Sequence, residues 1–357
     1  MTSASRASRR IGRANWSALL GIAVTIVLLW WTLRDVSLRD VWDHIRDVRP
    51  LLLLVTVVLA TATFPLRAIR WRYLLRLEGE ALPLAPLWHA AAIGFMANNV
   101  LPARAGEVAR AYAVRQLTAV RFTTALGSIV IERVLDGITL VVLLLVGAWA
   151  GGFSAQTTVG GVTIGTVARG AGVLFGALLV VALLVVRWPE LALGVAERFL
   201  KWALPSRWTR RLLGYLEGLV SGLEGLRTPG SLATVLVWSF AVWVTMAASF
   251  WTGFMAFGID VPWSAALLCQ AIIAFGVAIP SSPGFFGPFE ALVRVTLGLY
   301  GVPPEQAVSL AVGYHLATFL PITVLGMWSL TRTRLQLGQL RRSGELPDEP
   351  ADGAPAA

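Results

Sequence analysis

Long apolar stretches without a charged side chain dominate this sequence, and they constrain its fold more than any other feature. The hydrocarbon core of a bilayer is about 30 Å thick, and an α-helix needs about 20 apolar residues to cross it. Only 14% of the residues are charged, well below the roughly 25% of soluble chains. The charge-free stretches cover residues 14–33, 50–66, 81–103, 137–168, 170–186, 228–259, 261–289 and 306–331. Because several of them are long enough to span a bilayer, we expect an all-α polytopic membrane protein.

Arginines gather at the ends of the apolar stretches and predict how the chain threads through the membrane. Residues 1–13 carry Arg6, Arg9, Arg10 and Arg13, which predicts a basic cytoplasmic N-terminus. Alternation from there predicts about six full transmembrane helices: 14–33, the stretch that starts at Leu51, 124–150, 170–186, 230–257 and 306–331. This threading leaves both ends of the chain in the cytoplasm, and the expected location is the plasma (inner) membrane.

The segments between these helices differ in composition. Residues 36–49 mix aspartate and arginine with apolar residues at helical spacing, which predicts a short helix on the outer membrane surface. The glycine- and threonine-rich segment 151–168 should be an external loop, and the basic segment 187–227 should form cytoplasmic amphipathic helices. We therefore expect a single transmembrane domain over 14–335, with halves of about 14–186 and 228–335, and a disordered cytoplasmic tail over 336–357.

Two further stretches are interrupted by proline and glycine. The first, 85–102, has arginine on both flanks, so it should enter and leave the membrane on the same side as a re-entrant hairpin. The second, 264–300, should be a hairpin entered from the outside. Interrupted segments at corresponding positions of two inverted halves point to the midplane site of a transporter. The pair therefore predicts an inverted repeat; the alternative is that both are ordinary loops of a helical bundle.

Three ionisable residues lie near the start of the predicted helix 124–150. Glu132 and Asp136 are four residues apart and share a helix face, and Arg133 can reach Asp136 three residues on. Charged groups at membrane depth are costly, usually paired and functional. We expect a buried functional cluster; the alternative is an interfacial cluster among lipid headgroups.

Arg104, Glu107 and Arg110 follow the first hairpin at three-residue spacing and should line one side of a helix. The planar fork of arginine matches phosphate oxygens, and the free N–H groups of a helix that starts after Gly106 would add donors. Ordinary cytoplasmic positive charge is the alternative for the arginines. It does not explain Glu107 or the pair of asparagines just before the hairpin proline.

Few features suggest a metal, a cofactor or a nucleic acid. His315 could make a polar contact in the last predicted helix or be satisfied within the bundle, and the other histidines are not spaced as metal ligands with it. The single cysteine, Cys269, excludes an internal disulfide, and no Walker-type Gly-Lys-Ser/Thr element occurs. The net charge of +10 lies at the ends of apolar stretches, where anionic lipid headgroups are the expected partners. We expect no metal, no cofactor and no nucleic acid.

Four polar motifs follow one another along the chain. They are Arg67-x-x-Arg70-Trp71, Asn98-Asn99-x-Leu101-Pro102-x-Arg104-x-Gly106-Glu107-x-x-Arg110, Glu132-Arg133-x-x-Asp136 and Pro280-Ser281-Ser282-Pro283-Gly284-x-x-Gly287-x-x-Glu290. In this order they resemble the flippase-like transmembrane domain of bacterial lysylphosphatidylglycerol synthase proteins and of their stand-alone relatives. The resemblance implies a lipid-translocating domain with re-entrant helices over nearly the whole chain. It concerns the membrane part only, because too few residues follow 335 to form the soluble aminoacyltransferase domain of the two-part proteins.

We therefore expect a transporter that flips an anionic phospholipid or a polyprenyl-phosphate-linked glycan carrier across the membrane. The expected phosphate ligands are Arg67, Arg70, Arg104 and Arg110, and the carboxylates that orient them or exchange protons are Glu107, Glu132, Asp136 and Glu290. The other expected substrate contacts are Asn98, Asn99, Pro102, Gly106, Arg133, Pro280, Ser281, Ser282, Pro283, Gly284 and His315.

Two other functions stay open. One is an integral membrane glycosyl- or lipid-transferase with an external active site, for which Asp40 and Asp43 in the first external segment are the best support. These aspartates also fit the solvated face of an amphipathic surface helix. The other is a non-transporting accessory subunit. No residue is assigned a catalytic role.

Overall fold

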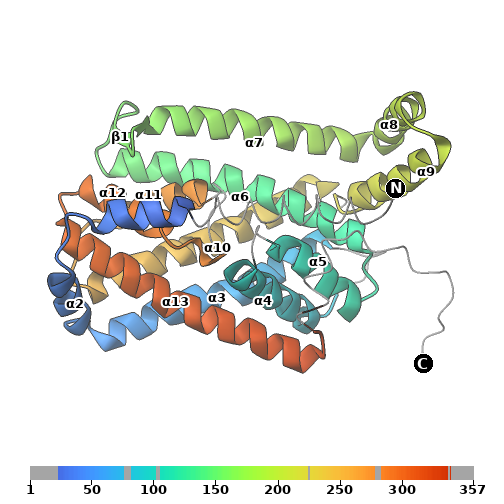
Figure 1. The fold of residues 1–357 in the computed structure, drawn as a ribbon. Helices are drawn as coiled ribbons and strands as arrows, with labels where there is room; N and C mark the ends of the chain where they lie inside the picture. Colours follow the sequence, from blue (N-terminus) through green and yellow to red (C-terminus); the bar gives the residue numbers. More distant parts are fainter. Residues whose placement is uncertain are drawn as a thin grey trace, which may run out of the picture.

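The chain forms an elongated bundle of α-helices with one small two-stranded sheet (Figure 1). The structure is a computed structural model that describes residues 23–75, 82–101, 105–223, 226–277, 283–336 and 338. Four helices are long and apolar enough to cross a membrane: α3 (Pro50–Leu74), α7 (Ile164–Arg187), α10 (Pro229–Ala256) and α13 (Pro304–Thr333). α6 (Phe122–Ala150) is 29 residues long, and a helix over Ala23–Leu33 is the described part of the first predicted span. The protein is an all-α multi-pass membrane protein, as predicted.

Proline sets the start of several of these helices. It occupies the first turn of α3, α10 and α13, where the missing N–H costs no hydrogen bond and the fixed φ favours a helix. Pro65 and Pro321 lie inside α3 and α13. A proline in a helix interior removes a backbone hydrogen bond, and in membrane helices neighbouring helices compensate. Here α3 packs along α10, and α13 packs along α4 (Leu84–Val100).

Two pairs of shorter helices are interrupted where the sequence predicts hairpins. The first pair is α4 and α5 (Gly106–Leu117). The second is α11 (Trp263–Gly276) and α12 (Pro288–Gly298), with a 3₁₀ turn, η3 (Pro283–Phe285), just before α12. The two pairs lie toward opposite ends of the bundle (Figure 1). All four helices are shorter than the roughly 20 residues that a span needs. The inverted arrangement of the two pairs and their re-entry into the membrane stay predictions.

Two boundaries differ from the sequence prediction. The first hairpin is larger than residues 85–102, because α4 alone fills that stretch and α5 is the return limb. The predicted external loop 151–168 is shorter, because α7 already begins at Ile164. The hydroxyl of Thr163 accepts the N–H of Thr166 and thereby caps that helix. β1 (Thr158–Val159) and β2 (Val162–Thr163) pair within the loop that remains.

The predicted surface helices are confirmed as helices. They are α2 (Leu38–Arg46), α8 (Pro189–Ala203) and α9 (Ser206–Ser221). α8 buries no side chain, and its apolar residues Phe199 and Trp202 are exposed, as expected for a helix that rests on a lipid surface. α2 lies at one end of the bundle, and α8 and α9 lie at the other (Figure 1).

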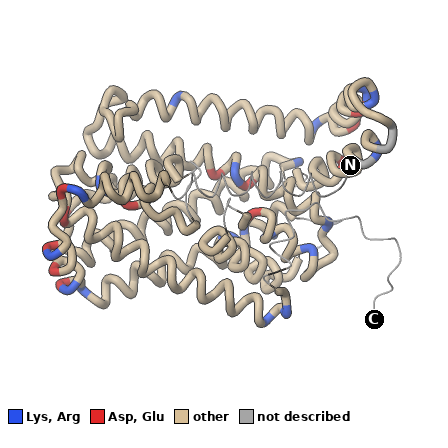
Figure 2. The backbone as a smooth tube through the Cα atoms, viewed as in Figure 1, with Lys and Arg blue, Asp and Glu red and all other residues tan. Residues whose placement is uncertain are grey.

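Most charged residues lie near the two ends of the bundle, but a group of them lies in its middle (Figure 2). On either side of this group is a separate hydrophobic core. One surrounds the first hairpin and includes Trp71 and Leu135; the other surrounds the second hairpin and includes Leu140 and Leu268. On α6, Asp136 lies between Leu135 and Leu140, so the change from one core to the other coincides with the central charges.

Candidate functional site

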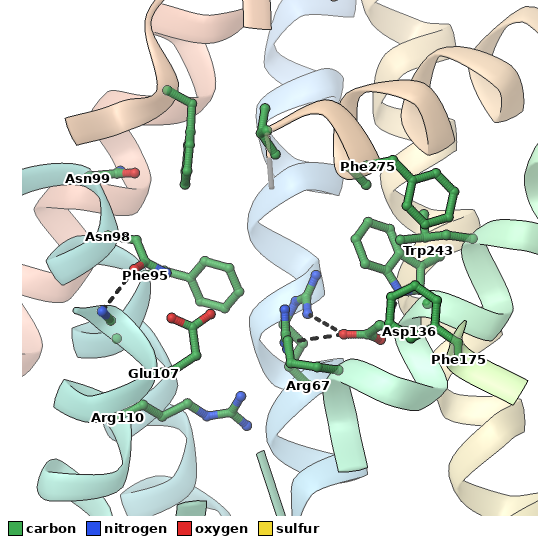
Figure 3. A pocket seen from close by; sticks show the side chains of 18 residues that line it. Arg67, Phe95, Asn98, Asn99, Glu107, Arg110, Asp136, Phe175, Trp243 and Phe275 are labelled. Carbon is green, nitrogen blue, oxygen red and sulfur yellow. Dashed lines mark hydrogen bonds and ion pairs between the residues drawn. The ribbon is translucent and has the colours of Figure 1, made fainter. Parts of the chain in front are cut away.

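A cavity of about 490 Å³ opens between the two hairpins. The first hairpin contributes Asn98, Asn99, Glu107 and Arg110, and the second contributes Phe275 and Phe285. α3, α6, α7 and α10 close the rest of the wall. Figure 3 shows Asn98, Glu107 and Arg110 on one side of the cavity, opposite Asp136 and Trp243. Segments nearly two hundred residues apart in the sequence thus meet at one chamber.

α6 supplies the two carboxylates that form the buried ion pairs of the site, Glu132 and Asp136. Asp136 is 2% exposed and binds Arg70, which donates to both carboxylate oxygens. The indole N–H of Trp243 donates to Asp136 Oδ1 at 2.8 Å. Arg70 also lies 3.1 Å from a carboxylate oxygen of Glu132 and donates to the hydroxyl of Ser239 at 3.0 Å. The four-residue spacing on α6 therefore places both carboxylates around one fully buried guanidinium.

Arg110, on the return limb of the first hairpin, is bound by Glu132. Its two terminal nitrogens donate to the two carboxylate oxygens at 2.7 and 2.9 Å. The guanidinium lies over the ring of Trp71, 3.7 Å from its centroid, and the Trp71 indole N–H donates to Ser128. This bidentate pairing ties α5 to α6 and leaves only the Nε atom of Arg110 without a hydrogen bond.

Arg133 completes the charged cluster, which we define as Arg67, Arg70, Arg110, Arg133, Glu132 and Asp136. Arg133 Nη2 lies 2.6 Å from Glu132 and 3.2 Å from Asp136, so the predicted contact to the residue three positions on is confirmed. Unlike Arg70, the Arg133 side chain is 39% exposed and lines the cavity. The cluster contains four arginines and two carboxylates, so its formal charge is positive.

Arg67 carries the unbalanced charge. It is 3% exposed, and its nearest carboxylate oxygen, on Asp136, is 4.0 Å away. Its Nε and Nη1 atoms are buried and have no hydrogen-bond acceptor in the part of the chain that the structure describes. The guanidinium lies against the rings of Phe95 and Trp243, at 4.9 and 5.4 Å from their centroids. Arg67 also lines the cavity. A buried cation with unsatisfied donors beside a cavity is suited to bind an anion.

The first hairpin adds polar groups to the same wall. Asn98 Oδ1 accepts the backbone N–H of Gly106 at 2.8 Å, so the end of α4 caps the start of α5. Asn99 donates to Thr323 on α13 at 2.9 Å. The backbone of Gly106 lies so close to Gly94 and Asn98 that a Cβ atom would not fit there. The glycine is therefore required by the close approach of the two limbs.

Much of the remaining lining is apolar. It includes Leu140, Ala274 and Val277 together with aromatic rings from five segments. Phe175 of α7 stacks on Phe275 of α11, with centroids 6.4 Å apart, and a Cβ on Gly137 would collide with the Phe175 ring. Phe95 and Phe285 add two further rings. A molecule with a charged headgroup and a hydrocarbon chain matches both the charged and the apolar parts of this lining.

Glu290 and His315 contact each other but do not line this cavity. Pro283 lies at the start of η3, and the backbone oxygen of Gly284 faces His315. Pro102, Arg104, Pro280, Ser281 and Ser282, which are also expected contacts, lie outside the described residues. Within the described ranges, no group of histidine, cysteine or acidic side chains is arranged to hold a metal.

Several lining residues have no sequence signal of their own. Phe95, Phe175 and Trp243 line the cavity and lie in apolar stretches, where a ring is ordinary. The same holds for Ser239, which does not line the cavity but accepts a hydrogen bond from Arg70. Their role depends on which face of each helix is turned toward the cavity. Hydrophobic periodicity does not reveal this face in helices that are apolar all round. The charged residues, in contrast, were all identifiable because charges are costly in a membrane.

Comparison with known proteins adds the family. The family described as the lysylphosphatidylglycerol synthase transmembrane region matches residues 18–326. The chain belongs to this family. The match contains every residue of the charged cluster and both limbs of each hairpin, so the candidate site lies wholly within the family's shared region.

Three individual relatives share less than 30% of their residues with this chain. Glycosyltransferase AglD of Haloferax volcanii is 28% identical over 344 residues, which cover 90% of this chain and 54% of AglD. The chain thus spans about half the length of that relative. Two UPF0104 membrane proteins of Methanothermobacter thermautotrophicus are 24% and 22% identical, over 86% of this chain and 90% and 92% of their own lengths. Each of these two alignments thus covers most of both chains.

Proposed function

We propose that this protein translocates a lipid with a phosphate headgroup, either an anionic phospholipid or a lipid-linked glycan carrier, across the plasma membrane. The observation that carries the proposal is Arg67, a buried guanidinium with unsatisfied donors at a cavity that is lined by both charged groups and aromatic rings. In this proposal residues 14–335 act as one transport domain, and both ends of the chain are cytoplasmic.

The charge of the cluster favours an anionic ligand. Four arginines and two carboxylates leave an excess positive charge, and Glu107 on the cavity wall offsets only part of it. An uncompensated cation away from water is costly, so a bound phosphate would remove a large desolvation penalty. Arg70 and Arg110 are held by carboxylates. Of the arginines expected to bind phosphate, Arg67 is therefore the best suited, and Arg133 can assist from the cavity wall.

The position of the cavity favours transport over simple binding. Both interrupted helix pairs contribute to one chamber, and they lie toward opposite ends of the bundle (Figure 1). A site between two inverted, broken helix pairs can be exposed to either side of the membrane by movement of one pair. The aromatic rings of the lining would hold the first part of the hydrocarbon chain while the headgroup binds Arg67.

A membrane transferase is the second candidate, because glycosyltransferase AglD is a relative. The alignment covers 54% of AglD, so the transferase activity in that name need not belong to the shared part. Asp40 and Asp43 lie on α2, at the end of the bundle, and neither lines the cavity. The two functions differ in what they consume, since a transferase uses up a donor and a translocator does not.

The test is lipid translocation by the purified protein in liposomes that contain a fluorescent anionic lipid. We expect wild-type protein to move the lipid between leaflets. Arg67→Gln should lower the rate by roughly 10- to 100-fold, the equivalent of about 1.5–3 kcal/mol for hydrogen bonds to a charged group. Arg67→Lys should lie between the two because it keeps the charge and loses the fork.

Arg72→Gln is the matched control, since Arg72 lies on the same helix, contacts Tyr73 and does not line the cavity. It should translocate lipid at the wild-type rate. Equal rates for Arg67→Gln and Arg72→Gln would refute the phosphate role of Arg67. Consumption of a lipid-linked sugar donor without leaflet exchange would refute translocation and support the transferase.

A further inference from the structure

Glu290 and His315 form a second buried ionisable pair, away from the charged cluster. Glu290 lies in the first turn of α12, and His315 faces it from α13. The two residues are 2% and 7% exposed. His315 Nδ1 lies 2.6 Å from Glu290 Oε1. On the other side of the ring, Nε2 lies 2.8 Å from the backbone oxygen of Gly284 in η3. The imidazole thus bridges a carboxylate and a carbonyl.

The hydrogen-bond partners fix how many protons the pair holds. A carbonyl oxygen only accepts, so Nε2 must carry a hydrogen. Glu290 Oε2 accepts the backbone N–H of Gly287 at 2.6 Å. Nδ1 and Glu290 Oε1 therefore share one further proton, either as imidazolium and carboxylate or as neutral imidazole and carboxylic acid. Both forms are neutral overall, and both satisfy every contact.

Loss of the shared proton cannot leave all these contacts in place. If the ring keeps its hydrogen on Nε2, then Nδ1 and a carboxylate face each other as two acceptors. If the hydrogen moves to Nδ1, then Nε2 faces the carbonyl of Gly284 without a hydrogen. The second form keeps the bond to the charged partner, Glu290, so the contact that breaks is the one to Gly284.

The His315 ring lies in apolar surroundings, where a change of charge is costly. The His315 ring stacks on Phe286 and packs against Phe289 and Phe319, so no water-rich surface compensates a charge there. The ionisable residues on the packed elements have other positions or partners. Arg294 on α12 donates to Asp35, Cys269 on α11 is buried, His89 on α4 contacts Ser329, and Tyr314 on α13 contacts Ser249. Glu305 and Arg332 lie in the first and last turns of α13, and the ionisable residues of α2 lie at one end of the bundle. On α3, Arg67 and Arg70 belong to the charged cluster and Arg72 contacts Tyr73. The helix Ala23–Leu33, which reaches η3 through Thr25 and Phe286, has no ionisable residue.

The contact that depends on the proton holds η3, a tight turn beside the cavity. Gly284 has a φ of 74°, a left-handed conformation that glycine adopts without strain. The next residue, Phe285, lines the cavity, and η3 packs against α4 of the first hairpin. The imidazole therefore fastens α13 to the turn that closes one side of the chamber.

We propose that Glu290 and His315 bind an exchangeable proton, and that this proton couples lipid movement to a pH gradient by fastening and releasing η3. This inference rests on the proposed lipid translocation. With the proton bound, η3 is held to α13 through Gly284; when the proton passes to water, the contact breaks and Phe285 can leave the cavity wall. The proton is thus a co-substrate of transport.

The first experiment measures lipid asymmetry at equilibrium in proteoliposomes with the membrane potential clamped at zero. If one proton moves with each lipid, a pH difference of one unit should produce up to about a tenfold lipid asymmetry. Wild-type protein and the control His89→Gln should develop it, and collapse of the gradient with an ionophore should abolish it. Glu290→Gln and His315→Gln should leave the lipid evenly distributed at any pH difference.

The outcomes separate the two proposals. Translocation by wild-type protein that ignores the pH gradient would overturn the proton site and leave the proposed function intact. If wild-type protein moves no lipid, both fall. If the variants fail to fold, ¹⁵N-histidine spectra of the wild-type protein decide. Once the shared proton is lost, the ring signals of His315 should be those of the form with hydrogen on Nδ1; signals that stay constant wherever the protein is folded would overturn the proposal.

Discussion

Removal of the Asp136 carboxylate charge is the most direct test of the charged cluster. Asp136→Asn keeps the shape of the side chain and an oxygen for the indole of Trp243. It removes a negative charge that faces the fully buried Arg70 and that also lies near Arg133 and Arg67. Glu132 would then be the one carboxylate left in the cluster, and the formal charge of the cluster would rise by one.

The size of the effect follows from burial. Loss of one partner of a buried ion pair costs about 3–5 kcal/mol, because the other charge stays away from water. For a chain of this length we expect the midpoint of thermal unfolding to fall by about 6–10 °C, at about 2 °C per kcal/mol. The loss should be smaller when a phosphate lipid is added, since the ligand supplies the missing negative charge.

The assay is thermal unfolding of the purified protein in detergent, with and without anionic lipid. The matched control is Glu197→Gln on α8, which removes an exposed pair with Lys201 at 2.7 Å. Exposed helical pairs contribute about 0.3–0.5 kcal/mol, so this variant should unfold within about 1 °C of wild type. If Asp136→Asn is as stable as Glu197→Gln, the arginines are solvated and the cluster is not a buried site.

Two further predictions test the architecture. Gly106→Ala should lower the unfolding midpoint by several degrees, because a Cβ would collide with Gly94 and Asn98 and overpacking costs about 1–3 kcal/mol, whereas Gly214→Ala, on a helix with open space, should be neutral or slightly stabilising. In a Cys269→Ala background, a cysteine placed at Thr157 should react with an impermeant thiol reagent in intact cells and one placed at Arg210 should not; the reverse pattern would invert the predicted topology.

Much of the fold follows from the sequence because the membrane limits the choices. An apolar stretch of about 20 residues must satisfy its backbone within itself, so it forms a helix wherever it lies. The positions of α3, α10 and α13 could therefore be predicted from charge-free stretches, and that of α6 from the alternation of spans along the chain. The start of α7 was missed, because threonine at Thr163 is common in loops and acts as a cap only when the next turn is helical.

The residues of the charged cluster were also predictable one by one, but their partners were not. The sequence placed Arg133 beside Asp136, since both lie on one helix. It did not show that Glu132 binds Arg110, that Asp136 binds Arg70 and Trp243, or that Arg67 is left without an acceptor. Such contacts join residues up to 107 positions apart. Only the packing of separate helices decides them.

The sequence by itself therefore determined that this is a multi-pass helical membrane protein with two interrupted helix pairs and a costly set of central charges. The tertiary structure decided which charges neutralise each other, which guanidinium faces the cavity, and that His315 joins Glu290 to the turn at Gly284. The physical reason is that local rules act over one helical turn, whereas the balance of buried charges depends on atoms that the fold brings within about 4 Å.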